Sequence, residues 1–369
     1  MAQLPENIRG SLEKFVRQLS VKETVSGVGL FGSWGRGDAT SSSDVDLLII
    51  DKRNFSREYV DRFNLKNGVI IDLNYIPRKW LAGQFPLEID QKLYETYILY
   101  DRDWSLTNTK DWLGRVYRKP HRVDLRTEGY VVESDILLSK AFSAYLRSDF
   151  QSACIFAGMA VESILKIFIE INFAPISNSR FIELLEESTD KLGMPHIFTS
   201  FLTVAQLSEV NHDEAERKLE LFKKFWNDFS SCIRKHTSVI DSLNFGVKTK
   251  LEYYGKPDFL RGIVTRTRDI IDRDKDIEAS HYLLSSLFSM VENYVPFISI
   301  VEETKFSYTT FLSVLRSLEE SVQMCENVVE AFDLTDVDHE YAGEHLRLAR
   351  ELVRDVRRWR KTLIDWFVE

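Results

Sequence analysis

The chain has 369 residues, of which 44% are hydrophobic, 12% aromatic and 28% charged, and its formal net charge is −9. This composition excludes a disordered or low-complexity chain and is sufficient for two or three domains with substantial cores. Apolar runs such as residues 45–50 and 164–171 are far shorter than the roughly 20 residues that cross a bilayer, so we expect no contact with a membrane.

Cysteine usage indicates a reducing compartment. The chain has three cysteines, Cys154, Cys232 and Cys325, which form no CxxC pair and are odd in number. Such a set does not provide a disulfide framework. We therefore expect a cytoplasmic protein, while the sequence predicts no particular oligomeric state.

Charge is distributed unevenly along the chain. Residues 1–125 contain 19 basic and 17 acidic residues, for a formal charge of +2, whereas the remainder contains 29 basic and 40 acidic residues, for −11. An acidic second part disfavours a polyanionic partner and favours small or cationic molecules, although an average charge does not exclude a local basic stripe.

The first part of the chain alternates helical and strand patterns. One face of a first helix carries five apolar residues, namely Ile8, Leu12, Phe15, Val16 and Leu19. Three apolar runs, at residues 28–31, 45–50 and 69–76, predict buried strands. The dipeptide Lys119-Pro120 and the polar residues 122–128 predict a linker, because the residue before proline disfavours helix.

The second part has a helical period almost throughout. Apolar residues recur at steps of three and four between residues 153 and 167 and again between 346 and 367. Breakers near Pro175, Pro195, Gly246, Pro257 and Pro296 predict helix ends. These patterns predict three parts: an α/β domain over 1–120, a helical bundle over 121–250, and a further bundle or extension over 251–369.

Residues 27–51, GVGLFGSWGRGDATSSSDVDLLIID, carry the candidate site. Gly27, Gly29 and Gly32 spell GxGxxG, which resembles a dinucleotide-binding fingerprint. That fingerprint requires an apolar helix after its third glycine, and here no apolar stripe appears before Val45. We therefore interpret the glycines differently, as part of a turn that follows a strand.

The turn at Gly32-Ser33 is a candidate phosphate site. Backbone N–H groups and the Ser33 hydroxyl at this point can bind the oxygens of a triphosphate. The guanidinium of Arg36, one turn later, can offset phosphate charge. Gly32, Ser33 and Arg36 are therefore the predicted nucleotide-binding residues.

Three aspartates are the candidate metal ligands. Asp44 and Asp46 flank Val45 at the start of a predicted strand, where alternate side chains face the same side. Asp72 lies within another apolar strand, where a carboxylate requires a partner. Together, Asp44, Asp46 and Asp72 predict a Mg²⁺ site of two ions, since hard oxygen ligands and phosphates suit Mg²⁺.

These motifs resemble those of the DNA polymerase β-type nucleotidyltransferase superfamily, in particular its minimal and kanamycin nucleotidyltransferase-like members. The resemblance rests on Gly32-Ser33, on Asp44-Val45-Asp46-Leu47 after a gap of ten residues, and on Asp72. It implies a small mixed-sheet domain followed by helices, an α+β fold. It also implies transfer of a nucleoside monophosphate from an NTP to a hydroxyl, with Asp44, Asp46 and Asp72 as catalytic and metal-binding residues.

The second part shows a further likeness. Residues 149–153 and 158–166 are similar to the helical bundle that follows the catalytic domain in kanamycin-type enzymes, a family that includes the HEPN domains. In the antibiotic-modifying enzymes a carboxylate of the helical part can act as general base. Glu162 and Glu133 are the candidates here, although Glu162 can equally be a structural polar residue on an apolar helix.

The sequence therefore predicts an enzyme that transfers AMP from ATP to a small hydroxyl-bearing acceptor. The acidic second part favours a polycationic acceptor such as an aminoglycoside. Two alternatives remain open: a nucleotidyltransferase that modifies a protein or RNA, as antitoxin-like and tRNA-end enzymes do, and a nucleotide-binding regulatory protein with little turnover.

Overall fold

The computed structural model describes residues 4–40, 42–64, 69–82, 85–307 and 311–368. The chain forms two compact units. The first unit consists of the N-terminal residues up to Lys119 together with residues 244–266, and the second consists of residues 120–243 and 267–369. Residues 244–266 thus return to the first unit, which the predicted divisions at residues 120 and 250 did not anticipate. The predicted α+β class is confirmed.

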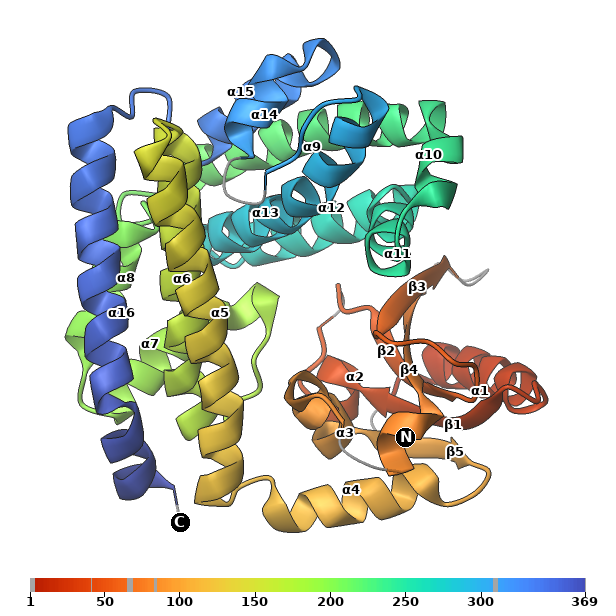
Figure 1. Cartoon of the computed structure of the whole chain (residues 1–369). Helices are drawn as coiled ribbons and strands as arrows, with labels where there is room; N and C mark the ends of the chain where they lie inside the picture. The colour runs from red at the N-terminus through yellow and green to blue at the C-terminus, as the bar shows by residue number, and fades with distance from the viewer. Residues whose placement is uncertain (1–3, 41, 65–68, 83–84, 308–310, 369) are drawn as a thin grey trace. The chain divides into compact units, whose positions relative to one another are not determined.

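The first unit is built on a mixed five-stranded sheet with the order β3-β4-β2-β1-β5 (Figure 1). Its central pair, β2 and β4, is parallel, and the other neighbours are antiparallel. The strands are β1 (Val25–Phe31), β2 (Val45–Asp51), β3 (Tyr59–Asn64), β4 (Ile70–Pro77) and β5 (Tyr97–Asp101). The three strands predicted from apolar runs are β1, β2 and β4.

Helix α1 (Glu6–Ser20) covers part of the sheet through the predicted apolar face. Leu12 and Leu19 are buried in one core with side chains of β1, β2 and β4, such as Val28, Leu47 and Leu73. The other helices of the N-terminal segment are α2 (Gly32–Arg36), α3 (Asp90–Glu95) and α4 (Ser105–Val116), with 3₁₀ turns at Arg78–Ala82 and Leu87–Ile89.

Residues 244–266, which we call the returning segment, pack against the edge strand β3. The segment contains α11 (Phe245–Tyr254) and the first ten residues of α12 (Pro257–Ile271). The Phe245 ring packs edge-on against Tyr59, with ring centroids 5.3 Å apart. Lys256 pairs with Asp61 of β3. Aromatic and ionic contacts therefore hold this late part of the chain on the N-terminal sheet.

The second unit is entirely helical in its described residues (Figure 1). Its helices, besides the end of α12, are α5 (Pro120–Leu146), α6 (Phe150–Ile171), α7 (Phe181–Lys191), α8 (Pro195–Val204), α9 (His212–Lys235), α10 (Thr237–Ser242), α13 (Asp276–Val301), α14 (Leu312–Ser317), α15 (Val322–Ala331) and α16 (His339–Phe367), with 3₁₀ turns at Asn178–Arg180 and Glu319–Ser321. Two sequence expectations are wrong here. Residues 122–128, expected in a linker, belong to α5, because proline is favourable at the first position of a helix and Pro120 begins this one. Pro296, expected at a helix end, lies inside α13.

Helix α6 is the core helix of the second unit. Most of its residues are buried, and Asp149 caps it by accepting a hydrogen bond from the Ser152 backbone. Arg126 of α5 donates to Glu170 of α6 over 2.6 Å, and both side chains are almost fully buried. This buried ion pair joins α5 to α6.

Two helices in the described part of the chain, α6 and α13, are long and apolar enough to cross a membrane by length and composition. In the structure, 83% of the apolar window of α6 and 67% of that of α13 is buried within the protein. Their hydropathy is therefore explained by packing, as in core helices, and does not indicate a membrane protein.

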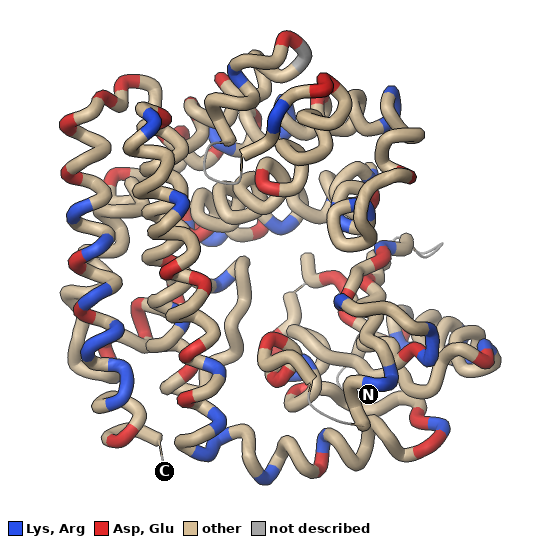
Figure 2. Tube along the Cα trace, in the orientation of Figure 1, with Lys and Arg blue, Asp and Glu red and all other residues tan. Residues whose placement is uncertain are grey.

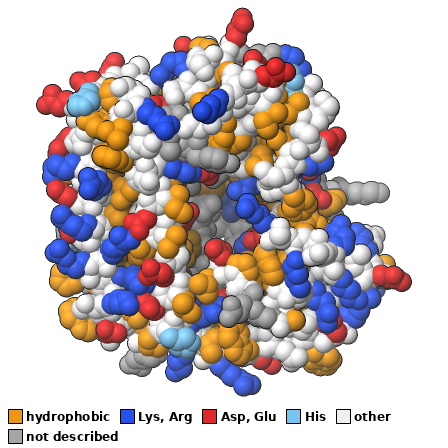
Figure 3. Space-filling view, in the orientation of Figure 1, with side chains coloured by type: hydrophobic (Ala, Val, Ile, Leu, Met, Phe, Trp, Pro, Cys, Tyr) orange, Lys and Arg blue, Asp and Glu red, His pale blue; other side chains and the backbone are white. Residues whose placement is uncertain are grey.

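The basic residues of α16 are largely neutralised within the second unit. Figure 2 shows them along this helix, and Figure 3 shows basic and acidic side chains intermingled on the same face. Arg360 is buried and pairs with Glu128 of α5, while Arg347 pairs with Glu344 and Glu351 of its own helix. Several basic residues of α16 thus form ion pairs, either within the helix or with α5.

Candidate functional site

The site begins at the sharp turn between β1 and α2. Gly32 has a φ of +67°, which L side chains rarely adopt. A Cβ at this position would lie 2.4 Å from Oδ2 of Asp46. Only glycine therefore allows the backbone of the turn to approach the Asp46 carboxylate this closely.

Asp46 and Asp72 come together because β2 and β4 are parallel neighbours. Asp46 is paired in register with Asp72, so their side chains project from the same face of the sheet. Asp44 precedes β2 by one residue and shares the face of Asp46 through strand alternation. Asp51, at the other end of β2, instead pairs with Arg53 over 2.7 Å.

Two arginines neutralise this carboxylate cluster. Nη2 of Arg62, on β3, donates to Oδ2 of Asp44 over 2.8 Å and to Oδ2 of Asp72 over 2.5 Å. Nη2 of Arg266, in the returning segment, donates to Oδ1 of Asp44 over 2.5 Å. The Arg62 guanidinium therefore lies between two of the predicted metal ligands, where a bound cation would be expected.

The returning segment adds a phenol to the same cluster. The hydroxyl of Tyr253 donates to Oδ2 of Asp72 over 3.1 Å, and its ring lies 5.2 Å from the Arg62 guanidinium carbon. Arg62 is only 7% exposed. The charged groups thus contact one another in a largely water-excluded space, where electrostatic interactions are strong.

The Asp46 carboxyl group shows the effect of this crowding. Burial and the negative charges of Asp44 and Asp72 raise the pKa of Asp46 well above its usual range, against the smaller effects of Arg266 and Lys92. The carboxylates therefore repel one another even with the arginines in place, and an additional cation would relieve this repulsion.

The phosphate side of the site holds a carboxylate. Glu95, at the end of α3, accepts a hydrogen bond of 3.2 Å from the backbone N–H of Gly32 and one of 2.9 Å from Nη1 of Arg36. Two of the three residues predicted to bind phosphate, Gly32 and Arg36, thus contact a carboxylate in the structure, whereas no contact of the Ser33 hydroxyl with Glu95 is seen in the described part of the chain. Their geometry is suited to oxygen ligands of negative charge.

The donor set fits a divalent cation by its chemistry. Asp44, Asp46 and Asp72 supply only hard oxygen atoms, the ligands that Mg²⁺ prefers, and the Arg62 guanidinium stands in for a cation between Asp44 and Asp72. Within the described residues, no group of three or more His, Cys, Asp or Glu side chains has the arrangement of a ready metal site. Metal binding at this cluster would therefore require the arginines to move.

Several residues of the cluster were not identified from the sequence. Arg62, Arg266, Tyr253 and Glu95 all contact predicted site residues. The strand that carries Arg62 was not predicted, so no local pattern indicated this residue. No local signal indicates Arg266, which is separated from Asp44 by 222 residues.

The two candidate general bases lie in the second unit. Glu162 is 7% exposed and bonds through Oε2 to Nε2 of His281 over 3.1 Å. Glu133 accepts a hydrogen bond from the Ser163 hydroxyl over 2.7 Å. The identity of a general base stays a prediction, and both carboxylates have structural partners.

The chain is similar to known proteins over part of its sequence. Residues 11–136 match the family model of the nucleotidyltransferase domain. No curated protein was found to match the chain. Among solved structures, a nucleotidyltransferase-like protein from Exiguobacterium sibiricum is similar over 88% of this chain and 90% of its own length, with 13% sequence identity and a TM-score of 0.33. The similarity to the nucleotidyltransferase domain thus covers residues 11–136, about a third of the chain.

Proposed function

We propose that the protein transfers a nucleoside monophosphate, AMP from ATP, to a hydroxyl group of an acceptor and releases pyrophosphate. The observation that carries this proposal is the register of Asp46 with Asp72 beside the Gly32 turn, within a segment that matches the nucleotidyltransferase domain. Phosphoryl transfer requires carboxylates and a turn that binds anions, and both lie together at one end of this sheet.

Each side of the site has a role in this proposal. The backbone N–H of Gly32 and the guanidinium of Arg36 would bind phosphate oxygens in place of Glu95. Asp44, Asp46 and Asp72 would hold Mg²⁺, two ions in the proposed mechanism. The metal would supply neutralisation of the charge on the phosphates and on the leaving pyrophosphate.

Arg62 and Arg266 would then serve the nucleotide rather than the carboxylates. In the structure both guanidinium groups pair with Asp44, and Arg62 also pairs with Asp72. Once cations neutralise these carboxylates, the guanidinium groups are available to phosphate oxygens, which they match in geometry. The returning segment would thereby contribute directly to nucleotide binding.

The acceptor is the least constrained part of the proposal. The acidic character of the chain beyond residue 125 supports a polycationic small molecule such as an aminoglycoside. A protein or RNA acceptor, modified in the cytoplasm, is the second candidate, favoured by the resemblance of the sequence to minimal nucleotidyltransferases and HEPN-like bundles. A regulatory protein with little turnover is the third.

The experiment is an AMP-transfer assay with the full-length protein, ATP labelled on the α-phosphate and Mg²⁺. A panel of aminoglycosides, simple alcohols, tRNA and the protein itself would be tested as acceptors. We expect label on one acceptor class, with loss of transfer in Asp46→Asn and full activity in Asp103→Asn, which removes a carboxylate that pairs with Arg78. Label on tRNA or protein alone would overturn the small-acceptor proposal, and ATP binding without any transfer would favour the regulatory role.

A further inference from the structure

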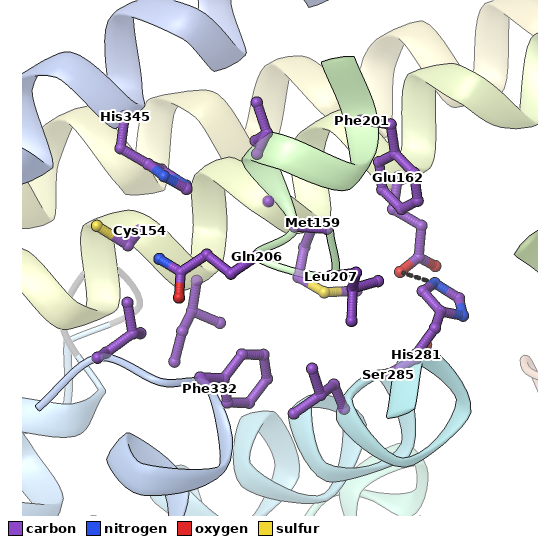
Figure 4. A pocket seen from close by; sticks show the side chains of 16 residues that line it. Cys154, Met159, Glu162, Phe201, Gln206, Leu207, His281, Ser285, Phe332 and His345 are labelled. Atoms are coloured by element: carbon purple, nitrogen blue, oxygen red, sulfur yellow. Dashed lines mark hydrogen bonds and ion pairs between the residues drawn. The ribbon is translucent and has the colours of Figure 1, made fainter. Parts of the chain in front are cut away.

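The second unit contains a pocket lined by residues other than those of the nucleotide site. It has about 480 Å³ of space not filled by protein atoms, part of it open to solvent. Its walls come from α6, α8, α13, α16 and the chain around Phe332 (Figure 4). Most lining residues are apolar, which is typical of sites that bind small organic molecules.

His345 is the distinctive polar group of this pocket. The ring extends from α16 toward the other lining side chains (Figure 4), and the residue is 7% exposed. One ring nitrogen bonds to the backbone of Cys154. Among the described residues, Nε2 has no hydrogen-bond partner. A buried nitrogen without a partner is costly in a folded protein.

The protonation of His345 defines what can bind to it. Burial lowers the pKa of His345 to about 4, against the effect of the Cys154 backbone bond. The imidazole is therefore neutral near pH 7. Because the nitrogen that faces the Cys154 carbonyl carries the proton, Nε2 has a free lone pair and acts as an acceptor.

Two other polar side chains of the pocket wall have partners. Glu162 pairs with His281 (Figure 4), and Gln206 donates to the hydroxyl of Tyr341. Nδ1 of His281 also lacks a partner in the described residues, but it points away from the other lining side chains (Figure 4). The pocket thus offers His345 as its acceptor among largely apolar surroundings.

Gly158 keeps one wall of the pocket open. It lies within α6, where glycine destabilises a helix by roughly 1 kcal/mol relative to alanine, and it lines the pocket. A Cβ at this position would meet no atom within 4 Å. No neighbouring protein atom therefore excludes a larger side chain at this position. A larger side chain would instead occupy space in the pocket, which glycine leaves open.

We propose that this pocket binds a small, largely apolar molecule, of the size of a single or fused ring, that donates one hydrogen bond from an N–H or O–H group to Nε2 of His345. The apolar walls would bury the body of the ligand, and the donor would satisfy the buried nitrogen. This site is independent of the proposed nucleotidyl transfer.

Indole and benzofuran are matched probes for the test, because they have the same fused-ring shape but only indole has an N–H donor. Isothermal titration calorimetry of the full-length protein at pH 7.5 would measure both affinities. We expect indole to bind roughly tenfold more tightly than benzofuran, the effect of one net hydrogen bond.

Three variants define the site. His345→Asn keeps an amide nitrogen where Nδ1 lies but removes Nε2, so the preference for indole over benzofuran should disappear. Gly158→Leu should abolish binding of both probes by filling the pocket. Gly129→Leu is the matched control, because Gly129 is an exposed residue of α5 whose Cβ would also meet nothing within 4 Å, and it should bind as the unsubstituted protein does.

The thermal unfolding of each variant would be measured in parallel, so that a folding defect is recognised. Binding that persists unchanged in Gly158→Leu would place the probes elsewhere and overturn the proposal. Equal affinities for indole and benzofuran in the unsubstituted protein would overturn the role of His345. Binding of neither probe would show a solvent-filled cavity only.

Discussion

Asp46 and Asp72 lie opposite each other on adjacent parallel strands, and a guanidinium from the neighbouring strand binds Asp72 on the other side. Two carboxylates in this relationship repel each other unless positive charge lies close by. The first unit supplies that charge from Arg62 and, through the returning segment, from Arg266. The proposed nucleotide site therefore contains its own counter-ions.

Asp46→Asn should change activity and stability in opposite directions. The folded protein disfavours the charged form of Asp46, since burial and two neighbouring carboxylates raise its pKa. A neutral amide of the same shape should therefore raise the melting temperature of the first unit. The same change should lower AMP transfer roughly 100-fold or more, because it removes a metal ligand. Calorimetry would measure the melting temperature, and the transfer assay would measure activity. Retained activity would show that Asp46 is not a catalytic residue.

Gly32→Ala tests the close approach of the turn to Asp46. The alanine Cβ would meet Oδ2 of Asp46 at 2.4 Å in a backbone conformation unfavourable for L residues. We expect a loss of more than about 1 kcal/mol in the free energy of unfolding and a marked loss of ATP affinity, measured by urea denaturation and calorimetry. In the control Gly10→Ala the Cβ meets nothing within 4 Å, and this change within α1 should stabilise the protein slightly. Similar behaviour of the two variants would contradict the geometry.

Arg266→Ala should strengthen divalent-cation binding in the absence of nucleotide. Arg266 pairs with Asp44 and competes for the oxygen atoms that a cation would use. Removal of this positive charge should raise the affinity for Mn²⁺, used as a probe for Mg²⁺, by roughly tenfold at low salt. In the proposed complex the Arg266 guanidinium binds phosphate oxygens. The variant lacks this group, so its KM for ATP should rise.

Titration of Mn²⁺ by electron paramagnetic resonance would measure the first effect. Arg261→Ala is the matched control, because Arg261 belongs to the same helix and pairs with Asp258 instead. An unchanged Mn²⁺ affinity in Arg266→Ala would separate Arg266 from the metal site.

The stability of the second unit should depend on His345 at acid pH. The folded-state pKa of about 4 is below the unfolded value of 6.5. The unfolded chain therefore binds this proton first, and the free energy of unfolding falls as pH decreases from 6.5 to 4. The loss from this one group is about 3 kcal/mol.

Urea denaturation between pH 7.5 and 4 would measure this slope. In His345→Asn the contribution is absent, so the decline should be shallower by that amount. His196→Asn, at an exposed histidine, should retain the full decline. Parallel curves for the two variants would contradict the buried neutral state of His345.

Removing one partner of the buried pair Arg126–Glu170 should lower the free energy of unfolding strongly, whereas replacing both partners by apolar residues should lower it much less. Both side chains are almost completely buried. Glu170→Met leaves the Arg126 charge without its partner and should destabilise the protein by about 3–5 kcal/mol in calorimetry. The double change Arg126→Met/Glu170→Met should cost much less, and a double variant as unstable as the single one would contradict this interpretation.

The sequence was informative where structure is determined locally. The apolar face of α1 and the strands β1, β2 and β4 follow from periodicity, and the spacing of Gly32, Asp44 and Asp46 indicated which residues to examine. The edge strands β3 and β5 were not predicted, because Asp61 and Arg62 interrupt the apolar pattern of one and the other has five residues.

Long-range contacts could not be read from the same patterns. Breakers near Gly246 and Pro257 predict helix ends, but they do not indicate that the helix between them, α11, packs against β3. The pairing of Arg266 with Asp44 and of Tyr253 with Asp72 depends on that return of the chain. The roles of Asp44, Asp46, Asp72, Ser33 and Arg36 in catalysis stay predictions.

The most direct test of the nucleotide site is a crystal structure of the full-length protein with Mn²⁺ and an ATP analogue that cannot be cleaved between its α- and β-phosphates. The anomalous signal of manganese would locate the cations. We predict manganese at the oxygens of Asp44, Asp46 and Asp72, phosphates at the Gly32 turn, and Arg62 and Arg266 turned away from the carboxylates. Nucleotide bound elsewhere, with both arginines still paired to Asp44 and no manganese beside it, would contradict the account.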